Sequence, residues 1–235
     1  PPGYGASFLG GAGSGANGPN GELLNFVLGG ATFTSGPKWL ALWNSSASNL
    51  NPLVNVPGIG TDAYQYRPVG KTVDMGKTYA YTWNVTLSAT LPDGSSIIRV
   101  IPDDMILGAT PLASFLGFGT PDPFTVWAIS LKPTSRGSLL WMRNYPAPAG
   151  NITRAFGPVD PKTRVWTMTN KETMQWLGFD LDTGDPLWGP VGAFRAFQYY
   201  GIVSHPPAPG YMAYGNLYVG GYGGELHCFD ARKGT

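Results

Sequence analysis

The carboxylates after one apolar segment are spaced like the first ligands of a calcium loop. Asp180, Asp182 and Asp185 surround Gly184 in the order Asp-x-Asp-x-Gly-Asp. A loop of the EF-hand type also needs a third oxygen ligand before the glycine and a distal glutamate, and the sequence has neither there. An aspartate at the end of a strand more simply accepts hydrogen bonds from the amides of its own turn. We therefore expect turn chemistry at Asp180 and no metal site.

The other chemistry-bearing residues do not form a catalytic set. His205 lies in a proline-rich loop, whereas His227, the only other histidine, lies on an apolar segment. A nucleophile, a base and an orienting group cannot be assembled from these positions. Paired carboxylates such as Asp103 and Asp104 lie in a turn, where solvated roles are usual. We expect no catalytic residue in this chain.

Two further patterns are weak as functional signals. The stretch 13–18 matches the dinucleotide pattern Gly-x-Gly-x-x-Gly, but it follows no strand and opens no helix, so its context excludes that function. Residues 1–22 are glycine-rich and are expected to form a loop or extended segment.

Cys228 is the only cysteine. On an apolar strand such a residue is usually a small buried hydrophobe, which predicts a buried thiol.

The elements that must position these residues repeat along the chain. The segments 126–141, 176–188 and 225–234 each contain an apolar strand followed by a polar turn with a glycine. In the first two, a second strand carrying tryptophan follows. Ile129, Phe179 and Phe229 are fifty residues apart. A period of that length indicates a repeat architecture, and antiparallel sheets stacked radially form a propeller.

The strand pattern extends this repeat over the chain. The segment 79–87 alternates between the two faces of a strand, whereas 45–78 is a long polar insertion typical of a functional loop. No sustained helical periodicity is present. We predict an all-β fold of four-stranded antiparallel propeller blades with minimal helix, a partial ring of about 3.5–4 blades. The expected strand pairs are 23–30 with 38–44, 97–101 with 105–108, 163–169 with 174–180, and 216–220 with 225–229.

Composition excludes several classes of protein. Gly and Pro number 34 and 22, but 8 Trp, 12 Tyr and 11 Phe are too many aromatic residues for a disordered chain. The formal net charge is +1 with no basic stripe, which argues against a nucleic-acid partner. The uncharged stretches 105–121 and 196–224 are broken by Pro and Gly, so neither spans a membrane.

The segment 180–188, Asp-Leu-Asp-Thr-Gly-Asp-Pro-Leu-Trp, resembles the repeat of the PQQ-like (quinoprotein-type) β-propeller superfamily. In that repeat a strand ends in Asp and is followed by x-x-Thr-Gly-x-x-x-Trp. The segment 216–234 looks like the preceding part of another copy, with Lys233 where Thr is typical. The copy around Trp141 has Ser130 in place of Asp, and the first copy keeps Trp83 and little else. The resemblance covers about residues 79–235.

The resemblance implies a structural role for the motif. Tryptophan and the Thr-Gly turn pack between adjacent blades, an aromatic burial worth roughly 2–3 kcal/mol. We expect 23–235 to form blades of a larger propeller, completed by further blades or by another chain in a homo-oligomer or filament. The expected motif residues are Trp83, Trp141, Asp180, Thr183, Gly184, Trp188, Asp230 and Gly234.

The resemblance also implies an enzymatic alternative. Quinoprotein dehydrogenases hold PQQ over a tryptophan and coordinate Ca²⁺ through Asp, Glu and Asn, and alcohol-oxidising members often carry two adjacent cysteines. The single cysteine excludes that pair here, and no carboxylate group matches the metal site. We therefore expect no cofactor and keep a PQQ-dependent dehydrogenase as the alternative.

Low charge and three glycosylation triplets favour an exported protein. Asn44, Asn84 and Asn151 each begin an Asn-x-Ser/Thr triplet, an acceptor for N-glycans outside the cell. We expect a secreted or cell-surface scaffold that binds protein or carbohydrate; the same features would also suit an envelope assembly scaffold or a surface-filament subunit. Exposed Tyr and Arg are common interface anchors, although they could instead fill the core between blades. The candidate binding residues are Tyr64, Tyr66, Arg67, Phe194, Arg195, Tyr199 and Tyr200.

Overall fold

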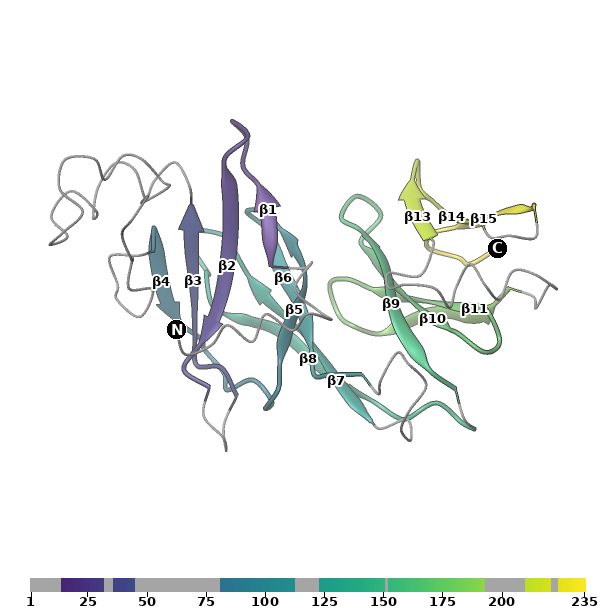
Figure 1. The fold of residues 1–235 in the computed structure, drawn as a ribbon, viewed down its shortest axis with the longest axis horizontal. Coiled ribbons are helices and arrows are strands. Elements are labelled where there is room, and N and C mark those ends of the chain that lie inside the picture. The colour runs from purple at the N-terminus through teal and green to yellow at the C-terminus, as the bar shows by residue number, and fades with distance from the viewer. Residues whose placement is uncertain are drawn as a thin grey trace, which may run out of the picture. The chain divides into compact units, whose positions relative to one another are not determined.

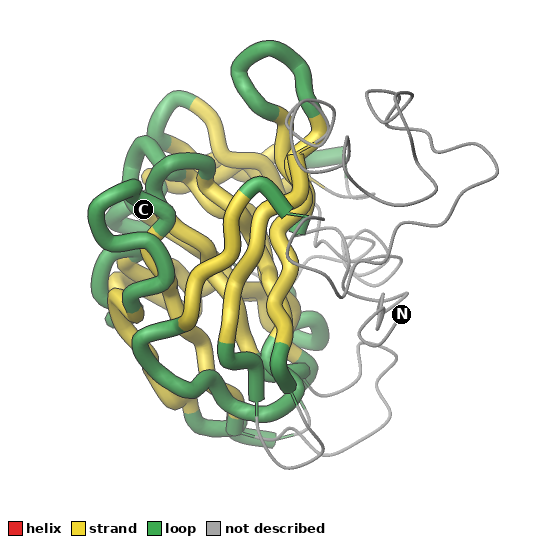
Figure 2. Tube along the Cα trace, turned by 90° about the vertical axis from the view of Figure 1, so that its left-hand side faces the viewer, coloured by secondary structure: helices red, strands yellow, loops and turns green. Residues whose placement is uncertain are grey.

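The structure is a computed structural model that describes residues 14–31, 36–44, 81–112, 123–150, 152–192, 210–220 and 224–235. These residues form β-strands and turns and contain no helix (Figure 1; Figure 2). The all-β prediction is confirmed. By compactness the chain divides into two units, residues 1–110 with 128–139 and residues 111–127 with 140–235. The boundary between the units passes through the second of four sheets.

Each sheet is an antiparallel meander in which consecutive strands are hydrogen-bonded neighbours. The first sheet contains β1 (Gly15–Asn17), β2 (Leu23–Gly29), β3 (Trp39–Asn44) and β4 (Trp83–Thr86). The second contains β5 (Ser96–Ile101), β6 (Met105–Ala109), β7 (Phe124–Ser130) and β8 (Leu139–Tyr145). The third contains β9 (Arg154–Asp160), β10 (Val165–Asn170), β11 (Gln175–Asp180) and β12 (Pro186–Val191). The fourth contains β13 (Gly210–Ala213), β14 (Asn216–Gly220) and β15 (Leu226–Asp230).

The predicted strand pairs all form, with ends within two residues of expectation. Within the segment 79–87, the strand is β4. Part of the glycine-rich segment 1–22 is extended as β1, which pairs with β2. The insertion 45–78 lies outside the described residues. Four successive sheets of three to four antiparallel strands are consistent with a partial β-propeller, as predicted.

Burial is greatest in the middle strands because both of their faces are covered. All six residues of β10 are buried. On one face, Trp166 stacks on Phe179 with ring centroids 4.2 Å apart. On the other face, the hydroxyl of Thr167 donates to the carbonyl of Pro158 at 2.8 Å, and that of Thr169 donates to the carbonyl of Gln175 at 3.2 Å. The hydroxyls of Thr167 and Thr169 are thus paired, as is usual for buried polar groups.

The third and fourth sheets pack through apolar side chains. Trp176 on β11 contacts the buried Leu217 and Val219 of β14, and Met212 and Phe229 pack against this cluster. The ring of Trp176 is 1% exposed. Burying a side chain of this size contributes roughly 2–3 kcal/mol. The face of β11 that carries Trp176 is therefore an internal surface between two sheets.

Candidate functional site

The turn after β11 is closed by its first aspartate. The Oδ1 atom of Asp180 accepts hydrogen bonds from the amides of Asp182 at 2.8 Å and Thr183 at 3.2 Å. The amide of Gly184 donates to the carbonyl of Asp180 at 2.9 Å, and the amide of Asp180 donates to the carbonyl of Asp185 at 2.8 Å. This oxygen of the carboxylate is thus used within the turn, which is the turn chemistry expected from the sequence.

The turn after β15 repeats these bonds fifty residues later. The Oδ1 atom of Asp230 accepts from the amides of Arg232 and Lys233, both at 2.9 Å. The amide of Gly234 donates to the carbonyl of Asp230 at 2.8 Å, and the amide of Asp230 donates to the carbonyl of Thr235 at 2.8 Å. The threonine typical of the repeat is not needed for these bonds, because Lys233 supplies only its backbone amide.

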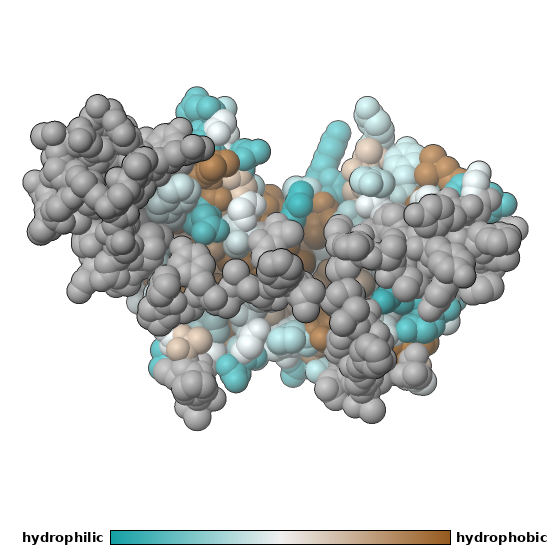
Figure 3. Space-filling model, viewed as in Figure 1, coloured by the Kyte–Doolittle hydropathy of each residue, from teal (hydrophilic) through white to brown (hydrophobic). Residues whose placement is uncertain are grey.

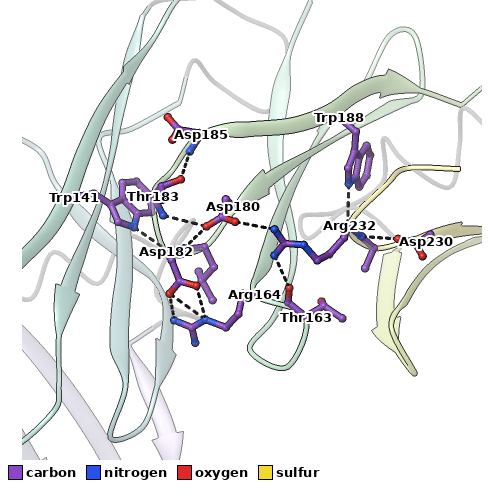
Figure 4. A network of polar contacts seen from close by, with 12 residues as sticks. Trp141, Thr163, Arg164, Asp180, Asp182, Thr183, Asp185, Trp188, Asp230 and Arg232 are labelled. Carbon is purple, nitrogen blue, oxygen red and sulfur yellow. Dashed lines mark hydrogen bonds and ion pairs between the residues drawn. The ribbon is translucent and has the colours of Figure 1, made fainter.

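A tryptophan on the fourth strand of one sheet attaches to the turn of the next sheet, a contact we call the tryptophan latch (Figure 4). The indole N–H of Trp141 on β8 donates to the carbonyl of Leu181 at 2.9 Å. The indole N–H of Trp188 on β12 donates to the carbonyl of Ala231 at 2.8 Å. Both partner carbonyls directly follow the turn aspartate, so the two latches are equivalent.

Each latch also requires a glycine under the indole ring. A Cβ atom on Gly184 would lie 2.7 Å from the ring of Trp141, and one on Gly234 would lie 2.6 Å from the ring of Trp188. Their φ angles are +77° and +70°, in the left-handed region that disfavours other residues. Backbone conformation and ring contact thus select glycine independently.

The contact between the first two sheets differs in detail. A Cβ on Gly137 would lie 2.9 Å from Cγ2 of Val85, so valine takes the place beside the glycine that the indole has in the latches. The ring of Trp83 instead has the guanidinium carbon of Arg136 at 4.5 Å from its centroid. Ser130, which replaces the aspartate, accepts from the amide of Lys132 at 3.2 Å. The weak sequence match of this copy corresponds to a different contact.

Arginines that the sequence analysis did not single out join neighbouring sheets. Arg143 on β8 donates from Nε to the carbonyl of Thr183 at 3.1 Å and pairs with Asp185 at 3.1 Å. Exposed ion pairs of this kind contribute about 0–1 kcal/mol each. Their role here is to set the position of the turn against the preceding sheet. The only sequence signal is the arginine two residues after Trp141.

Arg232 also joins two sheets, but it lies in the turn after β15 rather than on a fourth strand. Its Nη2 atom pairs with Oδ2 of Asp180 at 3.1 Å, and its Nη1 atom donates to the carbonyl of Thr163 at 3.1 Å (Figure 4). Nε of Arg164 donates to both carboxylate oxygens of Asp182 at 3.1 Å. Both oxygens of Asp180 are thus engaged, one in its own turn and one with the next sheet.

A buried tyrosine completes the contact between β8 and the turn after β11. The hydroxyl of Tyr145 donates to the carbonyl of Gly184. Burial raises the pKa of this hydroxyl above its usual value, Arg143 lowers it, and Asp185 raises it. Tyr145 also lies edge-on to the rings of Trp166 and Phe179. It thus joins the aromatic core to the polar turn.

Some of the remaining residues to which the sequence analysis assigned a role lie in the described part of the chain, and the others lie outside it. Asn84 is exposed on β4, and Asn44 is half-buried at the end of β3. Cys228 is exposed, which corrects the prediction of a buried thiol; the face of β15 that carries it has no covering sheet among the described residues. His227 pairs with Glu225 at 3.4 Å. His205, Asn151 and all seven candidate binding residues lie outside the described residues.

The carboxylates and tryptophans of the repeat motif have structural partners among the described residues. Within them, no group of three His, Cys, Asp or Glu side chains lies close enough together to hold a metal ion. Asp180 and Asp230 accept hydrogen bonds within their own turns, and the latch tryptophans pack between sheets. In the same part of the chain, no helix is long and apolar enough to cross a membrane.

Comparison with known proteins gives a likeness to a solved structure only. No family model and no curated protein sequence matches the chain. The chain is similar to the crystal structure of BamB from Moraxella catarrhalis, with 17% sequence identity and a TM-score of 0.38. The match covers 97% of this chain and 49% of that chain, so this chain spans about half the length of that protein. A TM-score of 0.38 supports no further inference from this likeness.

Proposed function

We propose that residues 23–235 are consecutive blades of a larger PQQ-like β-propeller that acts as a non-enzymatic scaffold. The resemblance of the repeat to the PQQ-like superfamily supports the family, and the tryptophan latches between successive sheets support the propeller. On this proposal the latches join the second sheet to the third and the third sheet to the fourth. The loops between strands, the insertion 45–78 among them, present residues to a partner.

The hydrogen bonds made by the polar residues of the repeat motif are the main support for this proposal. Asp180 is the carboxylate whose spacing resembled that of a calcium loop. Asp230 is the equivalent residue of the next sheet, and Arg232 contacts Asp180. Each forms hydrogen bonds within a turn or to the adjacent sheet. A carboxylate engaged at both oxygens by backbone amides and a guanidinium is held as a structural acceptor rather than freed for proton transfer or metal binding. The motif therefore supports assembly of sheets.

We propose an extracellular or cell-surface location with a protein or carbohydrate partner. The three Asn-x-Ser/Thr triplets support export, and the side chain of Asn84 is accessible to a glycosyltransferase because it is exposed. The candidate binding surface comprises Tyr64, Tyr66, Arg67, Phe194, Arg195, Tyr199 and Tyr200. Tyrosine and arginine suit such a surface because they combine large contact area with hydrogen bonding.

One assay separates the scaffold from the dehydrogenase alternative. The purified protein is titrated with PQQ in the presence of Ca²⁺, following tryptophan fluorescence, and then assayed for dye reduction with a panel of alcohols and sugars. We expect no saturable quenching and no turnover. Saturable PQQ binding accompanied by dye reduction would overturn the proposal. Intact-mass measurement of the native protein tests the location, because hexose-spaced increments that decrease in Asn84→Gln are expected for an exported glycoprotein.

A further inference from the structure

The turn that precedes β5 contains the only Asp-Gly pair of the chain, Asp93–Gly94. The amide of Ser95 donates to the carbonyl of Pro92 at 3.3 Å, and φ of Gly94 is +69°, a conformation that glycine readily adopts inside a tight turn. Both Asp93 and Gly94 are exposed. On the visible face of the described chain, hydrophilic residues gather at turns beyond the strand ends (Figure 3). The pair therefore lies in a tight turn in contact with water.

The backbone nitrogen of Gly94 lies against the side chain of Asp93. It donates to Oδ1 of Asp93 at 2.9 Å, and the carboxyl carbon is one bond further along the side chain. Among the described residues, this amide donates to no backbone carbonyl. Glycine also has no side chain that could shield its nitrogen. The turn thus holds a nucleophile and an electrophile close together, which favours their reaction.

The two Asn-Gly pairs of the chain have a different arrangement. Asn17–Gly18 and Asn20–Gly21 are the pairs that the sequence alone would select for the same ring closure, because an asparagine amide loses ammonia more readily than an aspartate carboxyl group loses water. The amide of Gly18 donates to the carbonyl of Glu22 at 2.8 Å, and the amide of Gly21 donates to the carbonyl of Gly18 at 3.0 Å. Both nitrogens must leave these bonds before they can attack a side chain.

We propose that Asp93 is a site of spontaneous isomerisation to isoaspartate. The nitrogen of Gly94 attacks Cγ of the protonated carboxyl group and forms an N–Cγ bond. The amide proton and the carboxyl hydroxyl group leave together as water, and a five-membered succinimide remains. Water then adds to one of its two carbonyl groups. Cleavage of the N–Cγ bond restores aspartate, whereas cleavage of the bond between the nitrogen and the backbone carbonyl carbon of Asp93 gives isoaspartate.

Isomerisation lengthens the main chain in the connection between the first and second sheets. In isoaspartate the chain runs through Cβ and Cγ, which adds one carbon atom, and the former backbone carbonyl carbon becomes a free carboxylate. The buried Leu91 precedes the turn, and β5 begins after it at Ser96. The bond from Ser95 to Pro92 closes over the inserted atom, so it is lost in the product. This chemistry does not depend on the scaffold function.

The test compares the folded 235-residue protein with the same protein denatured in guanidinium chloride. Both samples are incubated at mildly acidic pH, where part of an aspartate population is protonated. They are then digested and examined by electron-transfer fragmentation, which distinguishes isoaspartate from aspartate. The conversion rates of Asp93, Asn17 and Asn20 are measured in each sample. Asp93→Glu is the matched control, because it keeps the charge but would have to close a six-membered ring.

We expect the rate at Asp93 to agree between the folded and denatured samples within about threefold, and the rates at Asn17 and Asn20 to fall at least about tenfold on folding. Residue 93 of Asp93→Glu should keep its normal linkage. Slowing of Asp93 by more than about threefold on folding would overturn the proposal. A rearranged linkage at residue 93 that forms equally fast in Asp93→Glu would rule out the succinimide. Equal rates in both samples at Asn17 and Asn20 would overturn the selection of Asp93 by the fold.

Discussion

Replacing Gly184 by alanine should destabilise the chain more than backbone conformation alone explains. The new Cβ would lie 2.7 Å from the ring of Trp141 and 2.9 Å from Cγ of Arg143, and φ at this position is +77°. A left-handed conformation costs an L-residue about 1–2 kcal/mol. Crowding in a packed contact adds typically about 1–3 kcal/mol. The expected loss in the free energy of unfolding is therefore about 2–5 kcal/mol.

Gly150→Ala is the matched control for this prediction. Gly150 has φ of +74°, close to that of Gly184, but no atom of the described residues lies within 4 Å of a Cβ built there. Its substitution should cost only the conformational term of about 1–2 kcal/mol. Both variants are unfolded in urea and followed by circular dichroism and tryptophan fluorescence, with the free energy obtained by linear extrapolation. If the two losses agree within about 0.5 kcal/mol, the ring of Trp141 does not select glycine and the latch has been misunderstood.

Two further substitutions test the polar part of the latches. Trp188→Phe keeps an aromatic ring but removes the donor to the carbonyl of Ala231, so it should cost about 1–3 kcal/mol in urea unfolding. Trp176→Phe is its control, because the buried indole N–H of Trp176 has no hydrogen-bond partner among the described residues. An equal loss in both variants would assign the effect of Trp188→Phe to ring volume. Tyr145→Phe should cost about 1 kcal/mol at neutral pH by removing the donor to Gly184. Because burial raises the pKa of Tyr145 in the folded state, the stability contributed by its neutral hydroxyl is full below about pH 10, the value in the unfolded chain, and is lost as pH rises through the folded value. The difference between wild type and Tyr145→Phe should therefore shrink above about pH 10, and a constant difference up to about pH 11 would contradict this assignment.

The strand pattern and the local turn chemistry follow from the sequence alone. Apolar alternation, glycine-containing turns and the fifty-residue period predicted about 3.5–4 antiparallel blades. The ends of the predicted strand pairs agree within two residues, whereas β4 begins at Trp83 and not at residue 79. The capping of its own turn by Asp180 was also predictable, because the carboxylate and the amides it accepts from lie within three residues of each other. Such bonds depend on chain geometry over a few positions and need no information about distant segments.

The contacts between sheets were decided only by the tertiary structure. Two of these contacts, the pairing of Arg232 with Asp180 and the bond from Tyr145 to Gly184, join residues that lie far apart in the chain. The exposure of Cys228 likewise depends on whether a distant segment covers it. A side chain's partner across two sheets depends on which faces meet and in which register. Local periodicity determines neither the faces that meet nor their register, because the same alternation of apolar residues is compatible with a covered or an uncovered face. The sequence thus determined the repeating sheets, whereas packing determined which of their residues hold neighbouring sheets together.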